Sequence, residues 1–301
     1  RSQPLADLVP KLSTLTFQAD LGSMLDKTHR LERLVPVLAQ QLGLSAADRV
    51  VAQRAAFLVK ADLATHMVIE HTSLQGIMGA HYALLAGELE AVAKAIEEQY
   101  LPKGMGDALP TSPAGVVLAL ADRLDSLVGL FSVGLVPSGS ADPYALRRAA
   151  LGVVQILLGK RIPLSLRSAI DAAASVQPVS VTAEVRRDVL SFIQQRLRGL
   201  LLDQGYRYDV VDAVLGGYSG IPDFVDAVAR AEALSEFRTR PEFAAAYEAF
   251  DRAYRIWDKQ TRESPSPLEQ PAELALDRAL DRAGPRVGEL VRSRAYLRAL
   301  A

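Results

Sequence analysis

The sequence predicts an all-α protein, and three observations support that fold class. Apolar residues recur every three or four positions along nearly every segment, which is the period of a helix face. Short stretches rich in Gly, Pro and Ser separate these segments. The only segment with β character, Ser13–Gln18, is short and weak.

The first helix is indicated by a row of leucines on one face, namely Leu31, Leu34, Leu38 and Leu42. Pro36 lies inside the row, so the helix either kinks there or begins later than the row suggests. Ser45, with Asp48 three positions later, predicts the cap of the next helix.

Further helices are expected where apolar rows or capping residues recur. Asp142 is expected to cap a helix whose first residue is Pro143. Residues 74–87 contain three glycines and are expected to be looser, and residues 102–113 to be irregular. The expected helices are 46–66, 88–99, 114–131, 143–158, 164–175, 182–203, 222–238, 241–260, 272–283 and 286–301.

Composition excludes several classes of protein. A length of 301 residues suggests about two domains. The 34 basic and 35 acidic side chains give a net charge of −1, which argues against a uniformly basic nucleic-acid-binding surface. The absence of cysteine removes thiol catalysis and thiolate metal sites. No apolar run is long enough for a membrane helix, so we expect a soluble, cytoplasmic protein with no membrane partner.

Two acidic residues occupy helix faces that are otherwise apolar. Asp62 continues the row formed by Val51, Ala55 and Leu58, and Asp122 lies one turn after Leu118. A buried carboxylate needs a partner, because burying it unpaired costs several kcal/mol. The pattern is compatible with metal coordination, or with a structural network of arginines or helix N-termini.

The surroundings of these carboxylates resemble the HD superfamily of metal-dependent phosphohydrolases. The segment that opens at His29 resembles the first histidine helix of that superfamily, Ala61-Asp62 falls at its His-Asp pair, and Asp122 in LADRLDSL resembles its final aspartate. The resemblance implies His29, Asp62 and Asp122 as three of four metal ligands, with Ala61 in place of the fourth. Because alanine has no lone pair to donate, we expect an HD-like scaffold that has lost its metal and its hydrolase activity.

Longer segments resemble the β subunits of bacterial heterotetrameric glycyl-tRNA synthetases. They are TFQADLGSMLDKTHRLERL (16–34), KADLATHMVIEHTSLQGIMGAHYA (60–83), AIEEQYLPKGMGDALPTSPAG (95–115), the segment 118–153 and, more weakly, FRTRPEFAAAYEAFDRAYRIW (237–257). The resemblance implies that the α subunit activates glycine with ATP and Mg, while the β subunit binds tRNA(Gly). It implies no catalytic residue and no cofactor in this chain.

The same resemblance implies a division of the chain. We expect an entry segment (1–20), a degenerate HD-like helical domain (21–162), a helical connecting region (163–220) and part of an anticodon-binding-type domain (221–301). The Gly-rich stretch 216–222 is the clearest internal boundary. The chain starts at Arg1 and stops within a helix pattern, so we expect a C-terminal piece of a longer polypeptide, monomeric by itself.

Two sets of basic residues are candidates for contacting tRNA. Arg147 and Arg148 follow a Gly/Ser loop at a predicted helix start and suit a phosphate, although pairing of one of them with Asp122 or Asp125 is the favoured interpretation. On helix 241–260 a basic row consists of Arg252, Arg255, Lys259 and Arg262. Phosphate contact and a solvated face explain this row equally well.

An aromatic row runs beside the basic row and consists of Phe243, Tyr247, Phe250, Tyr254 and Trp257. Packing in a helical core is the favoured interpretation of this row, ahead of stacking on bases. The function that the resemblance implies is tRNA binding within the synthetase. The alternatives are an active HD phosphohydrolase and a purely structural scaffold.

Overall fold

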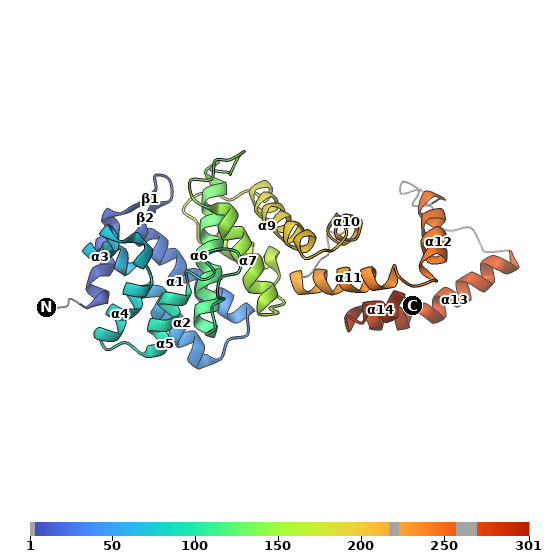
Figure 1. The fold of residues 1–301 in the computed structure, drawn as a ribbon, viewed down its shortest axis with the longest axis horizontal. Coiled ribbons are helices and arrows are strands. Elements are labelled where there is room, and N and C mark those ends of the chain that lie inside the picture. The colour runs from blue at the N-terminus through green and yellow to red at the C-terminus, as the bar shows by residue number, and fades with distance from the viewer. Residues whose placement is uncertain (1–3, 217–222, 257–269, 301) are drawn as a thin grey trace. The chain divides into compact units, whose positions relative to one another are not determined.

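The computed structural model describes residues 4–216, 223–256 and 270–300, and it confirms the all-α fold class (Figure 1). The chain divides into two compact units, one made of Arg1–Leu200 and Pro222–Val225 and the other of Leu201–Ile221 and Asp226–Ala301. The finer division at residues 20, 162 and 220 stays a prediction. Within the described ranges, no helix is both long and apolar enough to cross a membrane.

The first unit begins with a 3-10 helix and a two-stranded antiparallel sheet that lead into the first long helix. These are η1 (Leu5–Thr14), β1 (Thr16–Gln18), β2 (Gly22–Ser23) and α1 (Met24–Gln41). Ser23 and Asp26 form a capping box at the start of α1, because the Asp26 carboxylate accepts the Ser23 backbone N–H at 2.7 Å. The helix continues through Pro36 instead of beginning after it.

Helix α6 (Pro113–Ser132) forms the centre of the first unit. Nearly all of its side chains are buried, and it contacts α1, α2, α5, α7 and α8. The other elements up to the unit boundary are α2 (Ala46–Leu58), η2 (Ala61–Ala64), α3 (His66–Glu70), η3 (Thr72–Leu74), α4 (Ile77–Leu85), α5 (Glu90–Glu98), α7 (Leu146–Gly159), α8 (Leu166–Ser175) and α9 (Ala183–Asp203).

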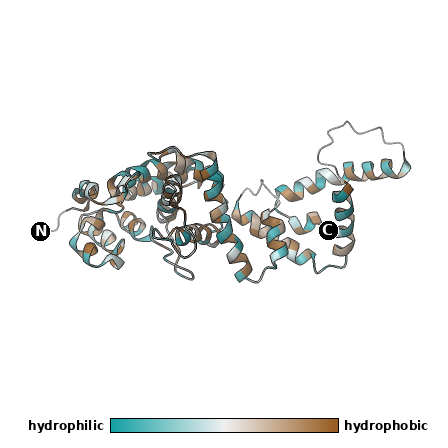
Figure 2. Cartoon of the chain, turned by 90° about the horizontal axis from the view of Figure 1, so that it is seen from above, coloured by the Kyte–Doolittle hydropathy of each residue, from teal (hydrophilic) through white to brown (hydrophobic). Residues whose placement is uncertain are grey.

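The remaining helices are α10 (Tyr208–Gly216), α11 (Phe224–Phe237), α12 (Phe243–Ile256), α13 (Pro271–Arg292) and α14 (Tyr296–Leu300). Apolar and polar residues alternate along the helices, as expected for amphipathic segments (Figure 2). The helices expected at 88–99, 114–131, 164–175 and 182–203 are confirmed to within two residues at each end. Helix α10 is a finding of the structure, because the apolar pattern did not lead us to expect it.

The expected helix 46–66 is wrong beyond Leu58. Val59 is extended, and Lys60 has a left-handed backbone with φ of 77°. The chain changes direction at Lys60, and the ammonium group of this same residue donates a hydrogen bond to Asp122 on α6 at 2.8 Å. Asp62 therefore lies on the 3-10 helix η2, although it is buried as expected.

Other boundaries also differ. Helix α7 begins at Leu146 and not at Pro143, and the Asp142 carboxylate caps it by accepting the Leu146 backbone N–H at 2.7 Å. The looser segment 74–87 contains the regular helix α4. The break expected between helices 272–283 and 286–301 is in the wrong place, because α13 continues through Pro285 to Arg292 and the chain breaks before α14 begins at Tyr296. Pro222 lies outside the described residues.

Candidate functional site

Buried ion pairs join α1, α6 and the turn after α2. We call Lys27, Arg30, Lys60, Asp122 and Asp125 the charge cluster. Lys27 Nζ lies 2.8 Å from Asp125 Oδ2 and 3.0 Å from Asp122 Oδ1. Arg30 Nε lies 2.7 Å from Asp125 Oδ1, and Lys60 Nζ lies 2.8 Å from Asp122 Oδ2.

The charge cluster contains three cations and two carboxylates, so it has one net positive charge. Burial by itself would raise the pKa of Asp122 and of Asp125, but the neighbouring ammonium and guanidinium groups, Lys27 foremost, hold both pKa values below their usual range. Both carboxylates are therefore ionised at neutral pH. The expectation that Arg147 or Arg148 neutralises one of them is wrong, since residues closer in space perform that role.

The positions that resemble HD ligands do not form one ligand set. His29 is exposed, and it is rotated about 200° around α1 from Lys27, away from Asp122. Ala61 is fully buried and offers no ligand atom. Both oxygens of Asp122 face ammonium groups. In the part of the chain that the structure describes, no group of three or more His, Asp or Glu side chains could hold a metal ion.

Asp62 is buried apart from the charge cluster. Its Oδ2 accepts the backbone N–H groups of Gly76 at 2.7 Å and Gly79 at 3.2 Å, while Oδ1 has no hydrogen-bond partner among the described residues. Burial raises the pKa of this carboxyl group above its usual value, although these two bonds and Lys60 oppose the rise. Asp62 thus accepts hydrogen bonds from backbone N–H groups at the start of α4. A helix N-terminus was one of the structural partners that we considered from the sequence. The residues present do not fit a divalent metal at the HD positions.

A pocket of about 410 Å³ lies beside the charge cluster. Its lining includes Asp122, Lys103 from the loop after α5 and Arg148 from α7. The Arg148 side chain is exposed, and among the described residues its guanidinium has no ion pair or hydrogen bond. Lys103 is also exposed. The pocket therefore combines two solvent-accessible cations with the net positive charge cluster.

The loop that carries Lys103 is fixed at its start by a buried arginine. Arg123 on α6 donates from Nη1 to the Gln99 carbonyl at 2.9 Å and from Nη2 to the Pro102 carbonyl at 2.9 Å. Burial lowers the pKa of Arg123 to about 10, so it stays charged at neutral pH. A Cβ atom at Gly152 would lie 2.4 Å from Arg123 Nε, so a larger residue at this position of α7 would clash with the guanidinium.

Glu98 fixes the far end of the same loop. Its carboxylate accepts the backbone N–H groups of Thr111 and Ser112, both at 2.9 Å, and also their hydroxyls. Burial would raise the pKa of Glu98, but these four hydrogen bonds outweigh it and hold the pKa below its usual value. Lys103 is thus presented from a loop anchored at both ends.

Arg147 differs from its neighbour. Its Nη2 donates to the Gly139 carbonyl at 2.7 Å and its Nη1 to the Ala141 carbonyl at 3.4 Å. Arg147 therefore ties down the loop before α7. Of the two candidate arginines, Arg148 is the one that faces the pocket.

The basic row on α12 is solvated. Arg252 pairs with Glu248 at 3.2 Å and Arg255 with Asp251 at 2.8 Å, and both arginine side chains are about three-quarters exposed. Lys259 and Arg262 lie outside the described residues. Their role in binding tRNA stays a prediction.

The aromatic row does not form a buried core in the described structure. Tyr247, Phe250 and Tyr254 are 58%, 65% and 49% exposed, and Trp257 lies outside the described residues. The rings stack along the helix, with centroids 6.0 Å apart for Phe243 and Tyr247. Phe243 also meets Phe237 of α11 edge-on, with ring centroids 5.8 Å apart, so the contact with another helix is made at the start of the row.

The lysines that neutralise Asp122 were not predicted from the sequence. Lys27 and Arg30 are three residues apart and therefore share one face of α1 with the leucine row. Two cations on an apolar helix face were the available signal for a buried carboxylate partner. Lys60 gave no such signal, because its position depends on the end of α2.

Comparison with known proteins agrees with the resemblance described above. The family model described as glycyl-tRNA synthetase beta subunit matches residues 1–216. The chain is 44% identical over 310 residues to the glycine–tRNA ligase beta subunit of Moorella thermoacetica, and the match covers 100% of this chain and 44% of that relative.

Other relatives give the same picture. The glycine–tRNA ligase beta subunit of Citrobacter koseri is 42% identical over 282 residues, which cover 92% of this chain and 40% of the relative. The beta subunit of Myxococcus xanthus is also 42% identical over 282 residues, with 91% and 40% covered. The chain thus spans less than half the length of these relatives.

Proposed function

The chain belongs to the family of glycyl-tRNA synthetase beta subunits, and we propose that it is a tRNA-binding part of such a subunit. In this role it supports the ATP-dependent glycylation of tRNA(Gly) in the cytoplasm. Amino-acid activation, with its ATP and Mg, takes place in the α subunit, which is the protein partner. The chain itself contributes RNA contacts and has neither a catalytic centre nor a cofactor of its own.

The pocket beside the charge cluster is the observation that carries this proposal. Arg148 and Lys103 present accessible cations there, and Lys27, Lys60 and Arg30 outnumber the two carboxylates. A guanidinium and an ammonium group bind phosphate oxygens well, and Lys27 and Lys60 neutralise Asp122, the member of the charge cluster that lines the pocket. Because phosphates repeat along an RNA backbone, such a site supports binding while leaving sequence recognition to other contacts.

The geometry does not favour a metal-dependent phosphohydrolase. A divalent ion at the HD positions would compete with Lys27 and Lys60 for the oxygens of Asp122. His29 lies on another side of α1, and Ala61 supplies no ligand. We therefore derive no hydrolytic step at this site.

A tRNA titration tests the proposal. The chain is titrated with tRNA(Gly) and with a non-cognate tRNA at two salt concentrations, by fluorescence anisotropy of labelled RNA. Each phosphate contact contributes roughly 0.9 to the slope of log affinity against log salt. We expect the double variant K103A/R148A to bind more weakly and to have a slope smaller by about two.

The matched control is R167A/R187A, which removes two exposed arginines outside the pocket, on α8 and α9. It should retain the affinity and slope of the unmodified chain. Absence of tRNA binding at any salt concentration would instead favour a structural scaffold. Equal losses in both double variants would show that the pocket has no special part in binding.

A further inference from the structure

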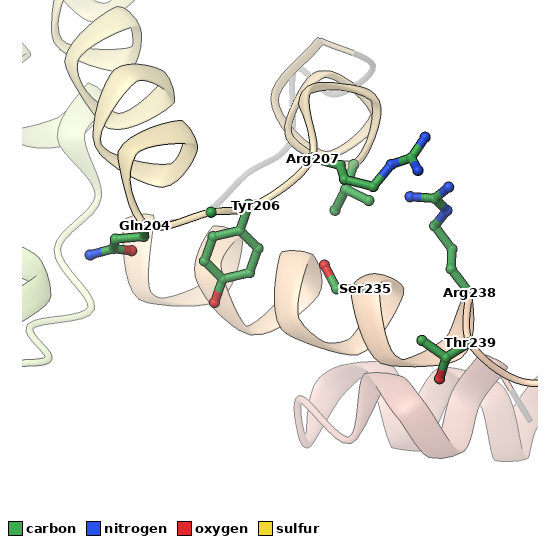
Figure 3. Close-up of a pocket in the computed structure, with 8 residues that line it drawn as sticks. Gln204, Tyr206, Arg207, Ser235, Arg238 and Thr239 are labelled. Carbon is green, nitrogen blue, oxygen red and sulfur yellow. The ribbon is translucent and has the colours of Figure 1, made fainter.

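A second pocket, of about 620 Å³, lies between the loop that joins α9 to α10 and the C-terminal end of α11. Its lining combines cations, hydroxyls, an amide and one aromatic ring, on residues Gln204, Tyr206, Arg207, Ser235, Arg238 and Thr239 (Figure 3). All of these residues belong to the second unit. Neither the sequence patterns nor the proposed function assigns a role to this pocket.

A glycine at the end of α9 shapes one wall of the pocket. Gly205 has φ of +91°, a conformation that residues with a Cβ rarely adopt. It ends the helix, and the Tyr206 backbone N–H returns to the Leu201 carbonyl at 3.1 Å. The reversal directs the chain over α11 and places Tyr206 and Arg207 on the pocket wall.

Two arginines meet at the pocket around a single carboxylate. Arg207 Nη2 lies 3.1 Å from Asp209 Oδ2, and Arg238 Nη1 lies 3.3 Å from Asp209 Oδ1. Figure 3 shows the side chains of Arg207 and Arg238 extending toward one another from the two walls. One guanidinium is enough to neutralise Asp209, so the two arginines and Asp209 together retain one positive charge. Most N–H donors of the two arginines have no partner among the described residues.

The pocket is also lined by an aromatic residue, Tyr206. Tyr206 is half-buried, and burial, followed by the charge of Glu232 and a hydrogen bond to it, raises the pKa of the Tyr206 hydroxyl. The hydroxyl is thus held by the protein, while the ring lines the pocket. Ser235 and Gln204 add groups that both donate and accept hydrogen bonds.

We propose that this pocket binds one unpaired nucleotide of RNA, with the phosphate on the N–H donors of Arg207 and Arg238 that Asp209 does not use and the base against Tyr206. The inference rests on the proposed function, since it names a second contact for the same RNA. A phosphate ion alone would leave most of the 620 Å³ unfilled and would not use the ring. A base within a duplex is stacked on its neighbours and has no free face, so the nucleotide must be unpaired.

Two variants separate the charge contact from the stacking contact. The chain is titrated with a labelled single-stranded RNA of twelve nucleotides and with a duplex of equal length. We expect R207A to weaken single-strand binding and to lower the salt slope by about 0.7. We expect Y206L to weaken it about tenfold with an unchanged salt slope, because stacking involves no counterion release. Duplex binding should change little in either variant.

The matched control is R240A, which removes an arginine beyond the same end of α11 that pairs with Glu236 and does not line the pocket. Circular dichroism checks that each variant is folded, and Y206F, which keeps the ring, should bind within about twofold of the unmodified chain. If Y206L and R207A bind single strands as R240A does, while tRNA binding persists, the pocket proposal is wrong and the proposed function stands. If the unmodified chain binds no tRNA, the proposed function fails, and the pocket proposal fails with it.

Discussion

Replacing Asp125 with asparagine should destabilise the first unit more than any surface substitution. The Asp125 side chain is fully buried, and its carboxylate receives Lys27 at 2.8 Å and Arg30 at 2.7 Å. In D125N, Lys27 keeps Asp122, but Arg30 keeps only neutral acceptors, namely the Leu21 carbonyl at 2.8 Å and the amide oxygen of the new side chain. A buried guanidinium then has no carboxylate partner.

The expected loss follows from that geometry. Breaking a buried ion pair by removing one member costs about 3–5 kcal/mol, because the remaining charge stays buried. The control is D171N, since Asp171 pairs with Arg186 at 3.2 Å where both side chains are more than 40% exposed. An exposed pair contributes at most about 1 kcal/mol, so D171N should be nearly neutral.

Urea unfolding at pH 7, followed by far-UV circular dichroism, measures both free energies of unfolding. The double variant R30M/D125N should recover part of the loss, because it removes the unpaired charge. Folding lowers the pKa of Asp125, so its contribution is complete above the unfolded-state value of about 3.9 and is lost as the pH falls further. The deficit of D125N should therefore shrink below pH 4. A loss at pH 7 no larger than that of D171N would refute the reasoning.

Three further predictions concern single residues of the first unit. G152A should lower the free energy of unfolding by about 1–3 kcal/mol, because the new methyl group meets the hydrogen-bonded Arg123. G199A, in a part of α9 with open space around the glycine, should raise it by up to about 1 kcal/mol. Thermal unfolding ranks the two variants, and equal Tm values would contradict the packing argument. E98Q should lower the free energy of unfolding by about 1–3 kcal/mol at pH 7, because an amide N–H₂ would face the donors of the loop. Since folding lowers the pKa of Glu98, this loss should decline as the pH falls below about 4.3. A loss that does not depend on pH would count against the prediction. Burial raises the pKa of Asp62, so ionisation of this carboxyl group destabilises the folded state. D62N should therefore gain stability relative to the unmodified chain as the pH rises from 4 to 7. Urea unfolding at pH 4 and at pH 7 checks the sign.

The apolar period of the sequence was sufficient to predict the fold class and the long helices. Helix α6 was expected to within one residue at each end, because large apolar side chains such as Val117, Leu124 and Phe131 recur in it at helical spacing. Periodicity failed at Lys60, where a left-handed residue ends the pattern although Asp62 continues it in register. It failed again at Pro285, where α13 continues through a residue that usually ends a helix.

The order of the residues was enough to predict that the chain is helical and that the carboxylates of Asp62 and Asp122 are buried and need partners. Both properties are local, because they depend on residues within a few helical turns. Which groups form ion pairs and hydrogen bonds with those carboxylates became clear only from the packing of the helices. Lys27 and Asp122 are 95 positions apart, and Arg207 and Arg238 meet at a pocket only because Gly205 reverses the chain over α11. Contacts of this kind depend on how helices pack, and helical periodicity carries no information about them.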